Sequence, residues 1–96
     1  MHLKIFFFAE LRERMNREFI ESEFQGVKNI RELQEKLEEN FEVLRGCFAE
    51  DKLIKIAINH EYCSLDAELR DGDEVAFFPP VTGGLFCEAN ESEYFS

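Results

Sequence analysis

The sequence predicts an α+β fold in which a mixed sheet of about four or five strands packs against one main helix. Two short apolar runs rich in β-formers, Leu3 to Phe8 and Glu74 to Phe78, lie near the two ends of the first 80 residues. Between them, Ile30 to Glu39 has the apolar spacing of an amphipathic helix. A single helix among several strands has to cover one face of a shared sheet.

The first expected strand, Leu3 to Phe8, contains no Gly or Pro and is too short for a typical helix. Its side chains alternate between two faces, with Leu3, Ile5 and Phe7 on one and Phe6 and Phe8 on the other. A short helical link is expected from Glu10 to Asn16. The alternating segment Arg17 to Phe24 then predicts a second strand with one solvated side.

The main helix has a recognisable start. Asn29 is followed three residues later by Glu32, which is the form of a helix N-cap, and apolar residues then recur at helical spacing at Ile30, Leu33 and Leu37. A further short helical turn is expected between Phe41 and Phe48, where it would cover the core.

The second half of the chain predicts more strands. Leu53 to Asn59 alternates, a tight turn through His60 leads to Tyr62 and Cys63, and Asp71 to Asp73 form a turn before the last strand. That strand ends at Pro79 and Pro80, which cannot donate to a central ladder. The order of strands and helix is that of the β-grasp type, in which the first and last strands lie side by side in the middle.

Composition limits the partners. The formal charge is −10, so phosphate backbones and anionic lipid surfaces are repelled, and neither nucleic acid nor membrane is an expected partner. No apolar run approaches the roughly 20 residues of a membrane helix, which favours a cytoplasmic protein. The odd number of scattered cysteines, Cys47, Cys63 and Cys87, predicts reduced thiols, and no residues have the spacing of metal ligands.

The segment from Asp71 to Gly84 reads DGDEVAFFPPVTGG, and it closely resembles the C-terminal signature of the MoaD/ThiS family of sulfur carriers, on the MoaD side. Phe7 to Glu13 and the pair Ile58 and Asn59 also resemble this family at the expected separations. The resemblance covers residues 1–84, which we expect to form the sulfur-carrier domain.

The resemblance implies a sulfur-donating subunit without a tightly bound cofactor or an active site of its own. A MoeB-like adenylating enzyme would use ATP to activate the Gly84 carboxylate, which then becomes a thiocarboxylate. A MoaE-like large subunit of molybdopterin synthase would receive the tail and pass the sulfur to a cyclic pyranopterin precursor, in molybdenum cofactor biosynthesis. A ThiS-like role in another pathway stays open.

The resemblance also implies which residues act. Val81, Thr82 and Gly83 would enter the partner with Gly84, because glycines without Cβ atoms pass a narrow channel. We expect a partner interface with exposed aromatic rings, unless a loop or the C-terminal segment covers them. Its members are Phe8, Tyr62, Phe78, Pro79 and Pro80.

The chain departs from the family pattern after the double glycine. Residues 85–96 follow as an acidic extension, expected to be loosely ordered, and a peptide bond at Gly84 leaves no carboxylate to adenylate. Some relatives lose such residues to a metalloprotease, so a processing protease is an expected partner. The alternative is a ubiquitin-like interaction module that never carries sulfur.

Overall fold

The structure is a computed structural model, and it describes residues 1–48 and 54–79. The elements follow the predicted order, with small shifts at their ends. They are β1 (His2–Phe7), α1 (Glu10–Met15), β2 (Phe19–Glu23), α2 (Ile30–Asn40), the 3-10 helix η1 (Glu42–Leu44), β3 (Lys55–Ile58), β4 (Glu61–Cys63) and β5 (Glu74–Phe78). β2, for example, begins two residues later than expected.

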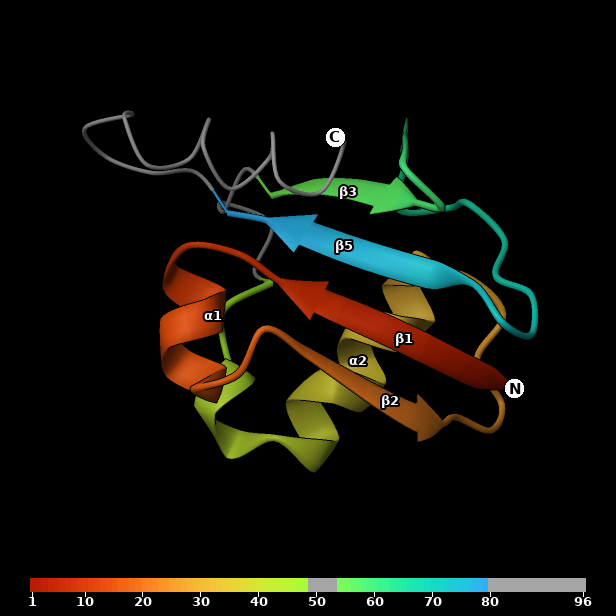
Figure 1. The fold of residues 1–96 in the computed structure, drawn as a ribbon. Coiled ribbons are helices and arrows are strands. Elements are labelled where there is room, and N and C mark those ends of the chain that lie inside the picture. The colour runs from red at the N-terminus through yellow and green to blue at the C-terminus, as the bar shows by residue number, and fades with distance from the viewer. Residues whose placement is uncertain (49–53, 80–96) are drawn as a thin grey trace.

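The strands form one five-stranded sheet in the order β2-β1-β5-β3-β4 (Figure 1). β1 and β5 run parallel in the middle of the sheet, and the other neighbours are antiparallel. The mixed sheet with its first and last strands side by side confirms the predicted β-grasp arrangement. Two strands from opposite ends of the sequence therefore hold each other in place at the centre.

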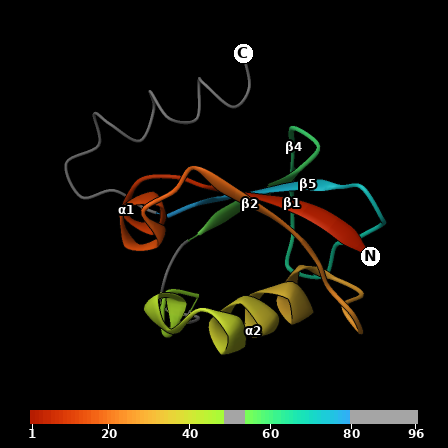
Figure 2. The same cartoon turned by 60° about the horizontal axis from the view of Figure 1, so that its bottom comes forward.

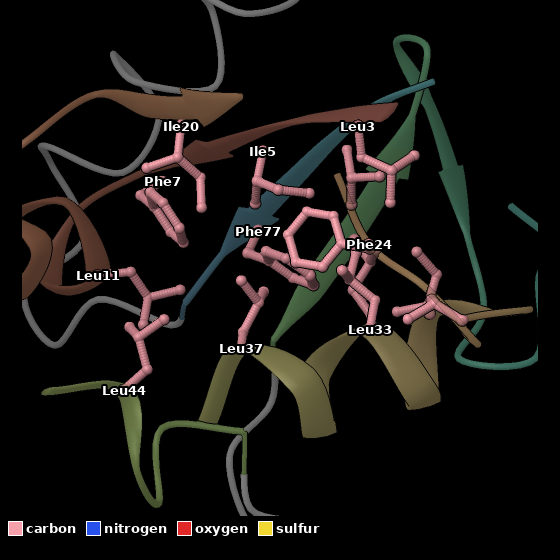
Figure 3. Close-up of a cluster of buried hydrophobic side chains, with 14 of the residues drawn as sticks. Leu3, Ile5, Phe7, Leu11, Ile20, Phe24, Leu33, Leu37, Leu44 and Phe77 are labelled. Atoms are coloured by element: carbon pink, nitrogen blue, oxygen red, sulfur yellow. The ribbon is translucent and has the colours of Figure 1, made fainter. Parts of the chain in front are cut away.

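The main core lies between the sheet and α2 (Figure 3). The predicted alternation of β1 is confirmed, because Leu3, Ile5 and Phe7 are all buried in this core. From the helix side come Ile30, Leu33 and Leu37, and from β5 come Val75 and Phe77. Burial of this apolar surface is the main stabilising contribution to the fold.

Two side chains fix the start of α2. The Glu32 backbone N–H donates to Asn29 Oδ1 at 3.0 Å, and the Lys28 backbone N–H donates to Glu32 Oε1 at 2.9 Å. These bonds satisfy a backbone donor that the first helical turn leaves without an intrahelical partner, and they hold the preceding chain against it. The predicted N-cap is therefore confirmed.

The hairpin between β3 and β4 is tied to the start of β5. Asn59 and His60 both have positive φ, at 50° and 72°, as a two-residue turn of this kind requires. The Asn59 side chain donates to Asp73 Oδ1 at 2.9 Å and accepts from the Glu74 backbone N–H at 3.0 Å. The hairpin thus fixes the strand from which the C-terminal segment leaves.

Candidate functional site

The predicted site has a part that the structure describes and a part that it does not. Pro79, buried at the end of β5, is the last described residue. Pro80 and the tail residues Val81, Thr82, Gly83 and Gly84 lie outside the described residues, as do residues 85–96. The roles given to them stay predictions.

The described part of the site is the face of the sheet opposite α2, which we call the second face (Figure 2). The strand register and alternation bring side chains from all five strands to it. Its apolar half consists of Phe8, Ala57, Tyr62, Ala76 and Phe78. These residues come from segments far apart in the sequence.

The aromatic rings of the apolar half are mostly buried. The Phe8 and Phe78 rings stack with their centroids 4.6 Å apart, and they are only 7% and 2% exposed. The Tyr62 ring meets Phe78 edge-on at 6.2 Å and is 56% exposed. The prediction of exposed rings is therefore confirmed for Tyr62 and wrong for Phe8 and Phe78.

Packing between strands accounts for part of that burial. Ala57 and Ala76 lie opposite each other on β3 and β5 and are fully buried. Because their side chains are single methyl groups, the larger neighbouring rings can lie over them. Together with Phe8 and Phe78 they form a hydrophobic cluster separate from the main core, with half-buried Phe6 packed against it.

Two lysines place positive charge on the second face. Lys4 Nζ lies 5.2 Å from the Phe6 ring centroid and 4.4 Å from that of Phe19, and Lys55 Nζ lies 5.8 Å from that of Tyr62. Cations over aromatic faces at these distances are attracted to the rings. None of these residues except Tyr62 was predicted to belong to the site, although the alternation of β1 already places Phe6 beside Phe8.

The end of the second face near the N-terminus is polar instead. His2 Nε2 lies 3.1 Å from Glu21 Oε2, and its Nδ1 lies 3.3 Å from Glu23 Oε1. The hydrogen bond to Glu21 and the charges of both carboxylates raise the pKa of His2 above its ordinary value. The apolar half and this charged end divide the face into two chemically different parts.

The described cysteines, Cys47 and Cys63, are both half-buried free thiols. Cys63 lies on β4, where burial raises the pKa of its thiol and so disfavours the nucleophilic thiolate. Within residues 1–48 and 54–79, no group of three or more His, Cys, Asp or Glu side chains could hold a metal ion. No helix in these same ranges is long and apolar enough to cross a membrane.

A five-stranded mixed sheet on one main helix, with its central last strand leading to a double-glycine tail, defines a ubiquitin-like protein of the β-grasp class. The model of the ThiS family matches residues 5–84, and the chain belongs to this family. The match ends at Gly84, the residue on which the predicted chemistry depends.

Two relatives align over nearly their whole length. The molybdopterin synthase sulfur carrier subunit of Escherichia coli is 37% identical over 84 residues, which cover 85% of this chain and 99% of the relative. The small archaeal modifier protein 3 of Haloferax volcanii is 33% identical over 92 residues, covering 88% of this chain and all of the relative. The first of these places the chain on the MoaD side of the family, as its motif predicted.

Solved structures agree with this fold. SAMP1 from Haloferax volcanii has a TM-score of 0.75 at 26% identity, with 88% of this chain and 100% of that one covered. A chain in the complex of subunits 1 and 2 of the molybdopterin-converting factor from Helicobacter pylori has a TM-score of 0.60 at 27% identity, with the same coverage.

Proposed function

We propose that this chain, once it ends at Gly84, is the sulfur-carrier subunit of a molybdopterin synthase. The observation that carries the proposal is the alignment that covers 99% of the Escherichia coli sulfur carrier subunit at 37% identity. The family match that stops at Gly84 supports the same boundary. The chain would carry sulfur on its own C-terminus and would leave catalysis to its partners.

The proposed reaction needs a free carboxylate at Gly84. A carboxylate oxygen attacks the α-phosphorus of ATP, pyrophosphate leaves, and the resulting acyl-adenylate has AMP as a good leaving group. Hydrosulfide then attacks the acyl carbon, displaces AMP and leaves a thiocarboxylate; a persulfide donor would instead give an acyl disulfide, whose S–S bond a thiol would then reduce to the same product. A MoeB-like enzyme would hold ATP during these steps.

The fold would present this terminus to a partner from a fixed base. β5 is paired on both sides, by β1 and β3, so the chain leaves the sheet from a strand that is held along both edges. Pro79 and Pro80 stiffen the first part of the tail, and Gly83 and Gly84 add no side chains to its end. The Helicobacter pylori complex supports a MoaE-like partner, for which the second face is the proposed docking surface.

Residues 85–96 would have to be removed first. In the longer chain, the carbonyl of Gly84 belongs to a peptide bond and cannot be adenylated. We therefore propose cleavage after Gly84 by a protease, and we expect the uncleaved chain to be inactive as a sulfur acceptor. The acidic extension carries Glu88, Glu91 and Glu93 with no basic residue.

The test is ATP–pyrophosphate exchange with a MoeB-like enzyme from the same organism, on chains that end at Gly84 and at Ser96. We expect exchange only with the chain ending at Gly84, because only that chain has a free carboxylate at Gly84. A matched control ends at Gly84 but carries Val43→Ala, which lies on η1, far in the sequence from the tail. Equal exchange with the chain ending at Ser96 would exclude the proposed mechanism.

A second candidate is a ubiquitin-like protein modifier, favoured by the 33% identity to the small archaeal modifier protein 3. A modifier would join its terminus to an amine of another protein instead of exchanging oxygen for sulfur. Isolation of the processed chain from cells distinguishes a modifier from a sulfur carrier. Recovery of this chain in covalent conjugates of higher mass supports the modifier. A free thiocarboxylate supports the carrier, and sulfur transfer to a thiamine precursor would indicate the ThiS-like alternative.

A further inference from the structure

β2 forms one outer edge of the sheet and pairs only with β1 (Figure 1). The Phe7 backbone N–H donates to the Glu18 carbonyl at 2.9 Å, and this register directs the backbone groups of the even-numbered residues towards β1. The three odd-numbered residues of β2 therefore turn their N–H and C=O groups away from the sheet. They are Phe19, Glu21 and Glu23.

The outward backbone groups of these three residues are open. Within residues 1–48 and 54–79, neither the N–H nor the C=O of Phe19, Glu21 or Glu23 forms a hydrogen bond. β2 contains no Pro, and it is longer than the opposite edge strand β4, with five residues against three. A long edge with open backbone groups is a template for a further strand.

The side chains of the same three residues define the chemistry of this edge. They lie on the second face, opposite Phe6, Lys4 and His2 of β1. The Phe19 ring is 40% exposed, and both glutamate side chains are at least half exposed. The edge therefore presents one aromatic ring and two carboxylates at alternate positions.

We propose that β2 binds an extended segment of a partner protein, which adds a sixth strand and carries basic side chains at two alternate positions and an apolar one at the next. Side chains directly opposite each other on neighbouring strands interact, and opposite charges stabilise such a pair. The basic side chains would lie beside Glu21 and Glu23, and the apolar one beside Phe19. Backbone hydrogen bonds would supply affinity, and the side-chain pairs would supply specificity.

The present ion pairs of the two glutamates do not prevent contact with another cation. Both carboxylates share the His2 imidazole, and Glu23 also pairs with the N-terminal ammonium group at 3.3 Å. Lys4 lies opposite Glu21, but its ammonium group lies over the Phe19 ring. Exposed ion pairs contribute little free energy, and a carboxylate accepts several donors. A partner's lysine or arginine can therefore join or replace these pairs.

Charge disfavours a second copy of this chain as the occupant. Antiparallel pairing of two β2 strands about Glu21 would set this residue against its own copy, and pairing about Ser22 would set Glu21 against Glu23. Like charges directly opposite each other destabilise a sheet. The formal charge of −10 also repels a second copy, whereas it attracts a basic segment.

This surface is separate from the one proposed for the large subunit. Tyr62 belongs to β4, and β2 and β4 are the two opposite edges of the sheet. Addition of a strand to β2 therefore involves neither Tyr62 nor Gly84.

The test is an NMR titration of the isotope-labelled full-length chain with a seven-residue peptide. The peptide has Lys at its second and fourth positions, Phe at its sixth and Thr elsewhere, which matches Glu23, Glu21 and Phe19 in antiparallel order. We expect the amide signals of β2 to shift and the Glu21 amide to exchange more slowly with solvent deuterium. The same peptide N-methylated at its central Lys cannot donate to the Glu21 carbonyl and should bind about tenfold more weakly.

A pair of matched variants tests the role of charge. Glu21→Gln combined with Glu23→Gln should weaken peptide binding about fivefold, because both cross-strand charge pairs are lost. Glu35→Gln combined with Glu39→Gln makes the same change in net charge on α2 and should leave the affinity unaltered.

Any of three results would overturn the proposal. Equal binding of the N-methylated peptide would indicate attraction by charge without a sixth strand. Missing shifts, or shifts confined to other strands, would exclude β2 as the site. Signals of β2 that depend on protein concentration without peptide would make a second copy the occupant. None of these results involves ATP or sulfur, so the pyrophosphate-exchange test of the proposed function stays separate.

Discussion

Replacement of Phe77 by Ala is expected to lower the free energy of unfolding by about 3–5 kcal/mol. Phe77 is fully buried on the central strand β5, where it lies opposite Phe7 of β1 and its ring centroid is 5.0 Å from that of Phe48. Loss of the ring removes apolar burial and leaves a cavity that the paired strands cannot close. The midpoint of urea denaturation, followed by far-UV circular dichroism, measures the effect.

The matched control for this variant is Val43→Ala. Val43 is 48% exposed on η1, so its truncation should change the free energy of unfolding by no more than about 0.5 kcal/mol. Phe77→Leu should fall between the two because it keeps most of the apolar volume. A loss below about 1 kcal/mol for Phe77→Ala would contradict the central place assigned to this ring.

The second large effect concerns binding. In the chain that ends at Gly84, Tyr62→Ala should weaken association with the MoaE-like large subunit of the same organism about 30-fold, the equivalent of about 2 kcal/mol. Tyr62 is more than half exposed beside buried Phe78, which is the position of an aromatic anchor at an interface. Isothermal titration calorimetry measures the dissociation constant, and the denaturation midpoint should change little.

Val43→Ala is again the control. Val43 is an exposed apolar side chain on η1, and η1 contributes Leu44 to the main core. The dissociation constant of the Val43→Ala variant should match that of the unaltered chain. Equal weakening by both substitutions would place the interface elsewhere, as would unchanged affinity of the Tyr62→Ala variant.

The fold could be predicted because its determinants are local and repeated. Alternation in β1 separates core from second face, Asn29 and Glu32 set the start of α2, and the sequence around Asn59 sets the hairpin. The tie from Asn59 to Asp73 and Glu74 was not predicted. It joins residues far apart in the sequence, and only the sheet order brings them together.

The site was predicted less completely than the fold. Alternation shows which face a side chain takes, but it carries no information on what lies above that face, so the burial of Phe8 and Phe78 was missed. Alternation in β1 also places Lys4 beside Phe6 on this face, whereas the position of Lys55 next to Phe78 depends on the register between β3 and β5, which a single strand does not reveal. Gly84, by contrast, was predicted from its motif alone, and its role stays a prediction because it lies outside the described residues.

The central claim is that Gly84 is the working terminus, and intact-mass measurement of the protein purified from its own cells tests it most directly. The account predicts a chain that ends at Gly84, part of it with one terminal oxygen replaced by sulfur. A protein that still ends at Ser96, isolated from cells with active molybdenum cofactor synthesis and without any shorter form, would contradict it.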